Sequence, residues 1–133
     1  MHVERHLAAA ERIARSLHKC RPHDVEMRIE GAMLAGSHWL NAALHRVGAT
    51  RFDADVMHTY LLTINEFRRL CVAQQDAMHA LRTIEDLRAP FVRGNWPGGM
   101  QAADRAIQQL NVIRARCTLV CAAQVDANEE EVR

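Results

Sequence analysis

The sequence is short of the features that mark several common classes of protein. Its 133 residues include one lysine, Lys19, beside sixteen arginines, and the net charge is +1. A charge so near zero gives no general case for nucleic acid or an acidic partner. The excess of arginine suits phosphate and carboxylate recognition, and a GC-rich coding genome would produce the same excess. Composition therefore describes an ordinary globular domain, without a strongly basic or acidic surface.

Catalytic motifs are also missing. The chain contains no G-x-S-x-G, no P-loop and no dinucleotide-binding fingerprint, so no motif predicts a hydrolase or a nucleotide-dependent enzyme. Ser37 stands directly before His38, but adjacent residues on a helix point in different directions. The sequence therefore contains no evident nucleophile with its base.

Neither disulfide bonds nor membrane segments are indicated. The four cysteines, Cys20, Cys71, Cys117 and Cys121, include no C-x-x-C pair, and buried free thiols in a reducing compartment explain them best. The first residues, MHVERHLAAAERIARSL, are charged and amphipathic, unlike a signal peptide. No apolar run approaches the roughly 20 residues that cross a bilayer. We therefore expect a cytoplasmic protein without a membrane partner.

The most apolar segment is residues 29–47, IEGAMLAGSHWLNAALHRV. A helix that is apolar nearly all round is usually buried on several sides, so this segment predicts the central helix of a bundle, ending at Gly48. One stripe, at three- and four-residue steps from Ile29 to Val47, should face the other helices. The opposite, semi-polar face predicts an interface with a second copy. It comprises Met27, Leu34, His38, Asn41 and His45.

Three other segments have helical periodicity: residues 3–20, 53–88 and 100–125. If it were one unbroken helix, the segment 53–88 would be about 54 Å long, whereas the central helix would be about 35 Å long. Helices of such different length match poorly in a compact bundle. Because Thr63-Ile-Asn-Glu66 has the pattern of a capping box, we predict a bend or break between Tyr60 and Gln74. The fold class predicted is all-α, an up-and-down antiparallel four-helix bundle. It forms a single domain over residues 1–125, followed by an acidic, frayed tail at 126–133.

Eight histidines make metal binding a hypothesis to test. His38 and His45 are seven residues apart, which places them on one helix face but about 10 Å apart along the axis. They cannot share one metal ion without other ligands. His2 and His6 are four apart, at a terminus expected to fray.

Two Asp–His pairs offer another route to a metal site. Asp55 and His58 are three residues apart, as are Asp76 and His79, so each pair could supply two ligands. Di-iron bundles use Glu-x-x-His motifs instead, and this chain has none. The pattern favours surface pairs, so no metal or other cofactor is predicted, and a metal-binding bundle built on these four residues remains an alternative.

The segment FVRGNWPGG, residues 91–99, is rich in glycine and proline. Free backbone N–H groups at the start of the next helix, with Arg93 nearby, could hold an anion beside Trp96. A tight loop between helices uses the same residues, and Trp96 suits capping the end of a bundle equally well.

Three stretches together resemble a known family. They are HWLNAALHRVGA (residues 38–49), HTYLLTINEF (58–67) and ALRTIEDLRAPFVRG followed by AADRAIQQLNVIRARC. Their order is similar to the helices of HEPN (higher-eukaryote and prokaryote nucleotide-binding) domains over about residues 27–121. The family's early tyrosine pair is absent at Glu30-Gly31-Ala32. Its Asp-Tyr before the last helix is replaced by Ala89-Pro90-Phe91.

The resemblance implies a helical binding or interaction module that acts as a homodimer, with RNA, a nucleotide or a partner protein as its ligand. Family members that cleave RNA without a metal have an arginine, four to six residues and a histidine. Arg51 and His58, with six between them, match that spacing, and so do Arg12 and His18 with five. The implied ribonuclease alternative uses His58 as general acid or base and Arg51 to hold phosphate.

Overall fold

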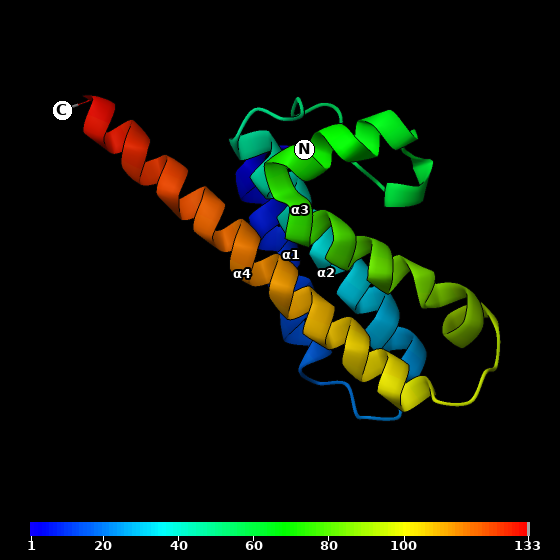
Figure 1. Cartoon of the computed structure of the whole chain (residues 1–133). Helices are drawn as coiled ribbons and strands as arrows, with labels where there is room; N and C mark the ends of the chain where they lie inside the picture. Colours follow the sequence, from blue (N-terminus) through cyan, green and yellow to red (C-terminus); the bar gives the residue numbers. More distant parts are fainter. Residues whose placement is uncertain (133) are drawn as a thin grey trace.

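The computed structural model describes the backbone of residues 1–132 and the side chains of residues 1–123. Four α-helices follow one another: α1 (Val3–Leu17), α2 (Val25–Arg46), α3 (Ile64–Asp86) and α4 (Gly99–Val132). Two short helices stand between them, the 3-10 helix η1 (Thr59–Leu61) and the π-helix η2 (Ala89–Arg93). No strand occurs within residues 1–132, and successive α-helices run in alternating directions (Figure 1). The predicted all-α four-helix bundle is confirmed.

The central helix of the bundle is α2. It packs against α1, α3 and α4, and Ile29, Leu40 and Leu44 have no exposed surface. A small residue lets α4 approach closely, because a Cβ added to Gly36 would lie 2.9 Å from Cδ1 of Ile113. The apolar sequence of α2 thus reflects burial on several sides, as predicted.

The end of α1 and the start of α2 differ slightly from the prediction. α1 ends at Leu17, before the predicted Cys20. Asp24 occupies the N-cap position of α2, but its Oδ2 accepts a hydrogen bond from the Arg21 N–H at 2.7 Å and caps no helical N–H group. Beyond α2, Gly48 adopts φ of +73°, the left-handed conformation that ends a helix at low cost when the residue is glycine.

The predicted break in the third helical arm is present. α3 begins only at Ile64, and the Thr63 hydroxyl accepts a hydrogen bond from the Glu66 N–H at 3.2 Å. The first part of the segment 53–88 is not continuous with α3, and the Tyr60 and Ile64 side chains are 62% and 73% exposed. Residues 53–58 form no helix, because they cross the end of the bundle before η1.

A second bend divides α3 itself. Gln74 has φ of −146° and ψ of 70°, outside the helical range. As a result, the Phe67 ring lies 5.5 Å from the His79 ring and 5.2 Å from Cζ of Arg82. In a straight helix these residues would be about 18 and 22 Å from Phe67 along the axis. α3 is therefore a V of two arms, residues 64–73 and 75–86 (Figure 1).

α4 is the longest helix and extends beyond the other three (Figure 1). It was predicted to end at Val125, before a frayed tail at 126–133. The backbone is helical to Val132, so the helix is longer than predicted, and fraying of residues 126–133 stays a prediction. Arg133 lies outside the described residues. Across the described helices, none is both long enough and apolar enough to cross a membrane.

Candidate metal centre

Three side chains with metal-ligand chemistry meet at one end of the bundle. His6 belongs to α1, His45 to the last turn of α2, and Asp55 to the segment that follows α2. Oδ1 of Asp55 is 2.9 Å from Nε2 of His6 and 2.7 Å from Nε2 of His45. The three residues each offer one ligand atom, and these atoms all lie within 4.8 Å of one another. We name this group the His6–His45–Asp55 cluster.

The packing of α1 on α2 explains how two of these residues meet. A short turn joins the helices, so they lie antiparallel and the start of α1 reaches the end of α2 (Figure 1). His6 lies on the buried face of α1, four residues before Ala10 and eight before Ala14, both buried. The side chains of His6 and His45 are each only 2% exposed. Asp55 is 24% exposed, and the terminal amine of Met1 lies 3.2 Å from its Oδ1.

Asn41 holds the third residue in place. Its Oδ1 accepts a hydrogen bond from the Val56 N–H at 2.7 Å, and its Nδ2 donates to the Val56 carbonyl at 2.8 Å. The Asn41 side chain is buried, as is Val56. Since Asp55 directly precedes Val56, this two-point contact positions the carboxylate against the histidines.

The second nitrogen of each histidine also has a partner. Nδ1 of His45 lies 2.7 Å from Oγ1 of Thr50, and Nδ1 of His6 lies 2.9 Å from Nδ1 of His38. A hydroxyl and a neutral imidazole can each donate or accept a hydrogen bond. Metal-binding histidines characteristically bond through their other nitrogen in this way, which fixes the orientation of the ring.

Electrostatics favour the protonation states that a cation requires. Burial lowers the pKa of His6 and outweighs the opposing effect of Asp55. Burial likewise lowers the pKa of His38, with a smaller contribution from His6. Burial opposes ionisation of Asp55, but hydrogen bonds from His45, His6 and the terminal amine bring its pKa to about 2. Neutral imidazoles and an ionised carboxylate are the forms that bind metal.

The distances show what would change when a cation enters. Ligand atoms around a tetrahedral ion with bonds of about 2.1 Å lie roughly 3.4 Å apart. The present N···O distances of 2.7 and 2.9 Å are those of hydrogen bonds. Around such an ion each of these two N···O distances would be longer by roughly half an ångström.

The predicted catalytic pair is not brought together. Arg51 is 83% exposed and pairs with Asp53 at 3.2 Å. His58 lies 3.8 Å from the Glu85 carboxylate and stacks on Tyr60. None of the polar contacts described for either residue includes the other, so ribonuclease activity at this pair stays a prediction.

The predicted anion loop uses its backbone groups internally. The N–H groups of Gly94 and Trp96 donate to the carbonyls of Ala89 and Pro90. Trp96 is 67% exposed and Arg93 is exposed as well. These are not the N–H groups at the start of α4 that the prediction concerned, so anion binding at Arg93 and Trp96 stays a prediction.

The four residues considered as metal ligands separate in the structure. Asp55 joins His6 and His45 rather than His58, while Asp76 pairs with Arg116 at 3.1 Å. Asp55 and His58 do not act as an i, i+3 pair, because Asp55 lies in a non-helical segment. Asp76 and His79 do lie on one helical arm, but the ligand cluster found among the described residues does not include them.

The predicted interface divides into two groups. Met27 and Leu34 are 66% and 48% exposed, and their role in a dimer stays a prediction. Asn41 and His45 are buried by α1 and the segment after α2, so they are corrected from interface residues to interior ones. His38 faces His6 in the same place. The polar groups of these side chains form hydrogen bonds with His6 and with the segment that follows α2.

His6 is the site residue that sequence reasoning missed, because it was assigned to a fraying end. The signal for it was its helical spacing to the buried alanines of α1. Comparison with family models, curated proteins and solved structures finds no match for this chain. The candidate site therefore rests on its geometry alone.

Proposed function

We propose that this protein binds one divalent transition-metal ion through Nε2 of His6, Nε2 of His45 and a carboxylate oxygen of Asp55. The observation that carries the proposal is the convergence of three ligand atoms within 4.8 Å, from three separate segments. Two imidazoles and one carboxylate suit zinc and ferrous iron, and also manganese, cobalt and nickel. Calcium and magnesium, which prefer oxygen ligands, fit this set poorly.

Three protein ligands leave at least one coordination position free. Sites of this kind typically hold a water or an exogenous ligand there, in contrast to closed structural sites with four protein ligands. The 24% exposure of the Asp55 side chain supports an open position that a ligand from solvent could reach. The proposed role is therefore metal-dependent binding or activation of a small ligand, rather than a purely structural metal.

Metal content and affinity test the proposal. Purified, untagged protein is stripped with a chelator and titrated with Zn²⁺ by calorimetry, with elemental analysis of the unstripped sample. We expect about one ion per chain. His6→Ala, His45→Ala and Asp55→Asn should each lower affinity by more than the roughly 10–100-fold that loss of an outer partner costs.

His79→Ala is the matched control, because His79 is an exposed histidine outside the cluster. It should bind Zn²⁺ like the wild type. Circular dichroism must show that each variant is folded, and Asp55→Asn, the mildest change, still tests the site if a histidine variant unfolds. A folded wild type that takes up no stoichiometric metal would reduce the cluster to an internal hydrogen-bond network.

A second candidate is the HEPN-like interaction module acting as a homodimer. The observation that favours it is apolar surface on α2 and α4: Met27 is 66% exposed, Leu34 48% and Leu119 67%. Sedimentation velocity over a range of concentrations tests this. A dimer weakened by Leu34→Glu or Leu119→Glu would support it, and a monomer at every concentration would contradict it.

A further inference from the structure

The V of α3 encloses a hollow that the metal proposal does not use. Its volume is about 670 Å³, within the range of roughly 300–1,000 Å³ typical of small-molecule sites. Both arms of α3 line it, and η1 closes one side. His6, His45 and Asp55 are not among its lining residues, so this is a separate place on the molecule.

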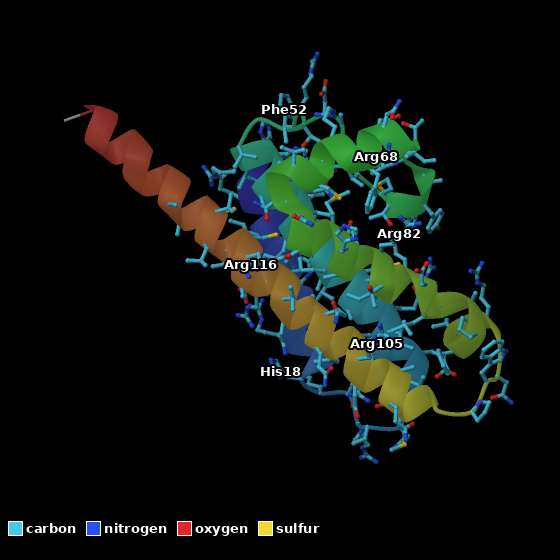
Figure 2. All side chains as sticks on the ribbon, viewed as in Figure 1. His18, Phe52, Arg68, Arg82, Arg105 and Arg116 are labelled. Atoms are coloured by element: carbon cyan, nitrogen blue, oxygen red, sulfur yellow. The ribbon has the colours of Figure 1, made fainter. Side chains whose placement is uncertain are left out.

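Two arginines face this hollow without a carboxylate partner. Arg68 comes from the first arm and Arg82 from the second (Figure 2). Six other arginines form ion pairs with acidic side chains. Arg68 and Arg82 form no such pair with any described residue. The guanidinium of Arg82 lies 5.2 Å above the Phe67 ring, which orients it while leaving its N–H edge available.

The acidic residues of the hollow do not neutralise those arginines directly. Both oxygens of Glu85 accept from the Thr59 N–H at 3.1 Å, and the residue is only 7% exposed. Asp86, the other carboxylate, is exposed on the second arm. The guanidinium groups of Arg68 and Arg82 are therefore the charged donors that remain for a ligand.

The remaining lining is aromatic and apolar. Tyr60 and Ile64 are 62% and 73% exposed, although they stand at the hollow rather than on an outer polar face. Phe67, three residues after Ile64 on the same arm of α3, also lines the hollow. Covering these surfaces would remove apolar area from water, which favours a ligand with a flat hydrocarbon body.

We propose that the hollow between the arms of α3 binds a small organic anion. Its head group would accept hydrogen bonds from Arg68 and Arg82, and its flat apolar body would lie against Phe67, Tyr60 and Ile64. Carboxylates and phosphate esters share the required chemistry, because both accept the paired N–H donors of a guanidinium. This site is independent of the metal cluster, so either proposal can fail without the other.

The test uses three probes with one ring system: 2-naphthoate, 2-naphthyl phosphate and the neutral 2-naphthylmethanol. Each is titrated into the as-purified protein and followed by NMR shifts of the Ile64 and Leu62 methyl groups, with affinities from the same titrations. At least one of the two anions should bind at these methyls, at least about tenfold more tightly than the alcohol. Whichever of the two anions binds with the higher affinity identifies the preferred head group.

Arg68→Gln and Arg82→Gln should each lower the affinity for the preferred anion by about fivefold or more, because one charged hydrogen-bonding group is lost. Arg105→Gln is the matched control, an exposed arginine on α4 away from the hollow (Figure 2), and should bind like the wild type. The proposal is overturned if neither anion shifts these methyl groups at millimolar concentration. Equal affinity for the alcohol, or affinities unchanged in both arginine variants, would overturn it too.

Discussion

His6 and His38 meet with their Nδ1 atoms 2.9 Å apart, which requires one ring to donate a proton at Nδ1 and the other to accept it. Without a metal, the Asp55 carboxylate can only accept, so His6 carries its proton on Nε2 and accepts at Nδ1 from His38. With a metal on Nε2, the proton must sit on Nδ1 of His6, and His38 becomes the acceptor. Thr50 can exchange roles with His45 in the same way.

Replacing His38 tests this relationship. His38→Phe removes the partner of the His6 ring and should weaken Zn²⁺ binding by about 10–100-fold, the usual cost of losing an outer hydrogen bond to a metal ligand. His38→Gln, whose amide can donate or accept, should retain most of the affinity. Calorimetric titration measures both. Equal affinity in His38→Phe and wild type would show that His38 does not position His6.

Replacing Asn41 tests how the Asp55 segment is held. Asn41→Leu leaves the buried N–H and carbonyl of Val56 without their partners. Each buried polar group left unpaired costs about 1–3 kcal/mol, so we expect the two together to lower the free energy of unfolding by roughly 2–6 kcal/mol. Urea denaturation measures it. Asn65→Ala, at an exposed position of α3, is the control and should change stability by less than about 1 kcal/mol. A loss no larger in Asn41→Leu than in this control would contradict the role given to Asn41.

Glu85 gives stability a defined dependence on pH. Burial raises its pKa above the usual 4.5, so the folded state holds this proton more tightly than the unfolded state. Its contribution to stability is therefore present at low pH and is lost as pH rises through the raised pKa. The Glu85→Gln variant has no such carboxyl and does not lose this stability. The difference in free energy of unfolding, variant minus wild type, should therefore be larger at pH 7 than at pH 4. A shift of one pKa unit would correspond to about 1.4 kcal/mol.

Urea denaturation at the two pH values measures that difference. Glu85→Ala separates charge from hydrogen bonding, because it leaves the Thr59 N–H without its acceptor. It should be less stable than Glu85→Gln at both pH values, by about 1–3 kcal/mol. If the difference between Glu85→Gln and wild type is the same at pH 4 and pH 7, ionisation of Glu85 does not affect folding.

The sequence by itself determined the elements and their order. The apolar run around Leu40 predicted the central helix, and the spacing of Thr63 and Glu66 predicted the start of α3, because helical periodicity and caps are local properties. The spacing of His38 and His45 also placed them correctly on one face of α2. It could not tell whether that face met solvent, a second chain or the chain itself.

Only the tertiary structure decided the candidate sites. His6, His45 and Asp55 are separated by up to 49 residues in sequence and meet because α1 lies antiparallel to α2 and Asn41 holds the returning segment. The hollow of α3 depends on the bend at Gln74, where no glycine or proline marks a break. Both sites join groups through contacts distant in sequence, and short-range patterns carry little information about such contacts. Packing of complementary surfaces, rather than local propensity, determines where those groups come together.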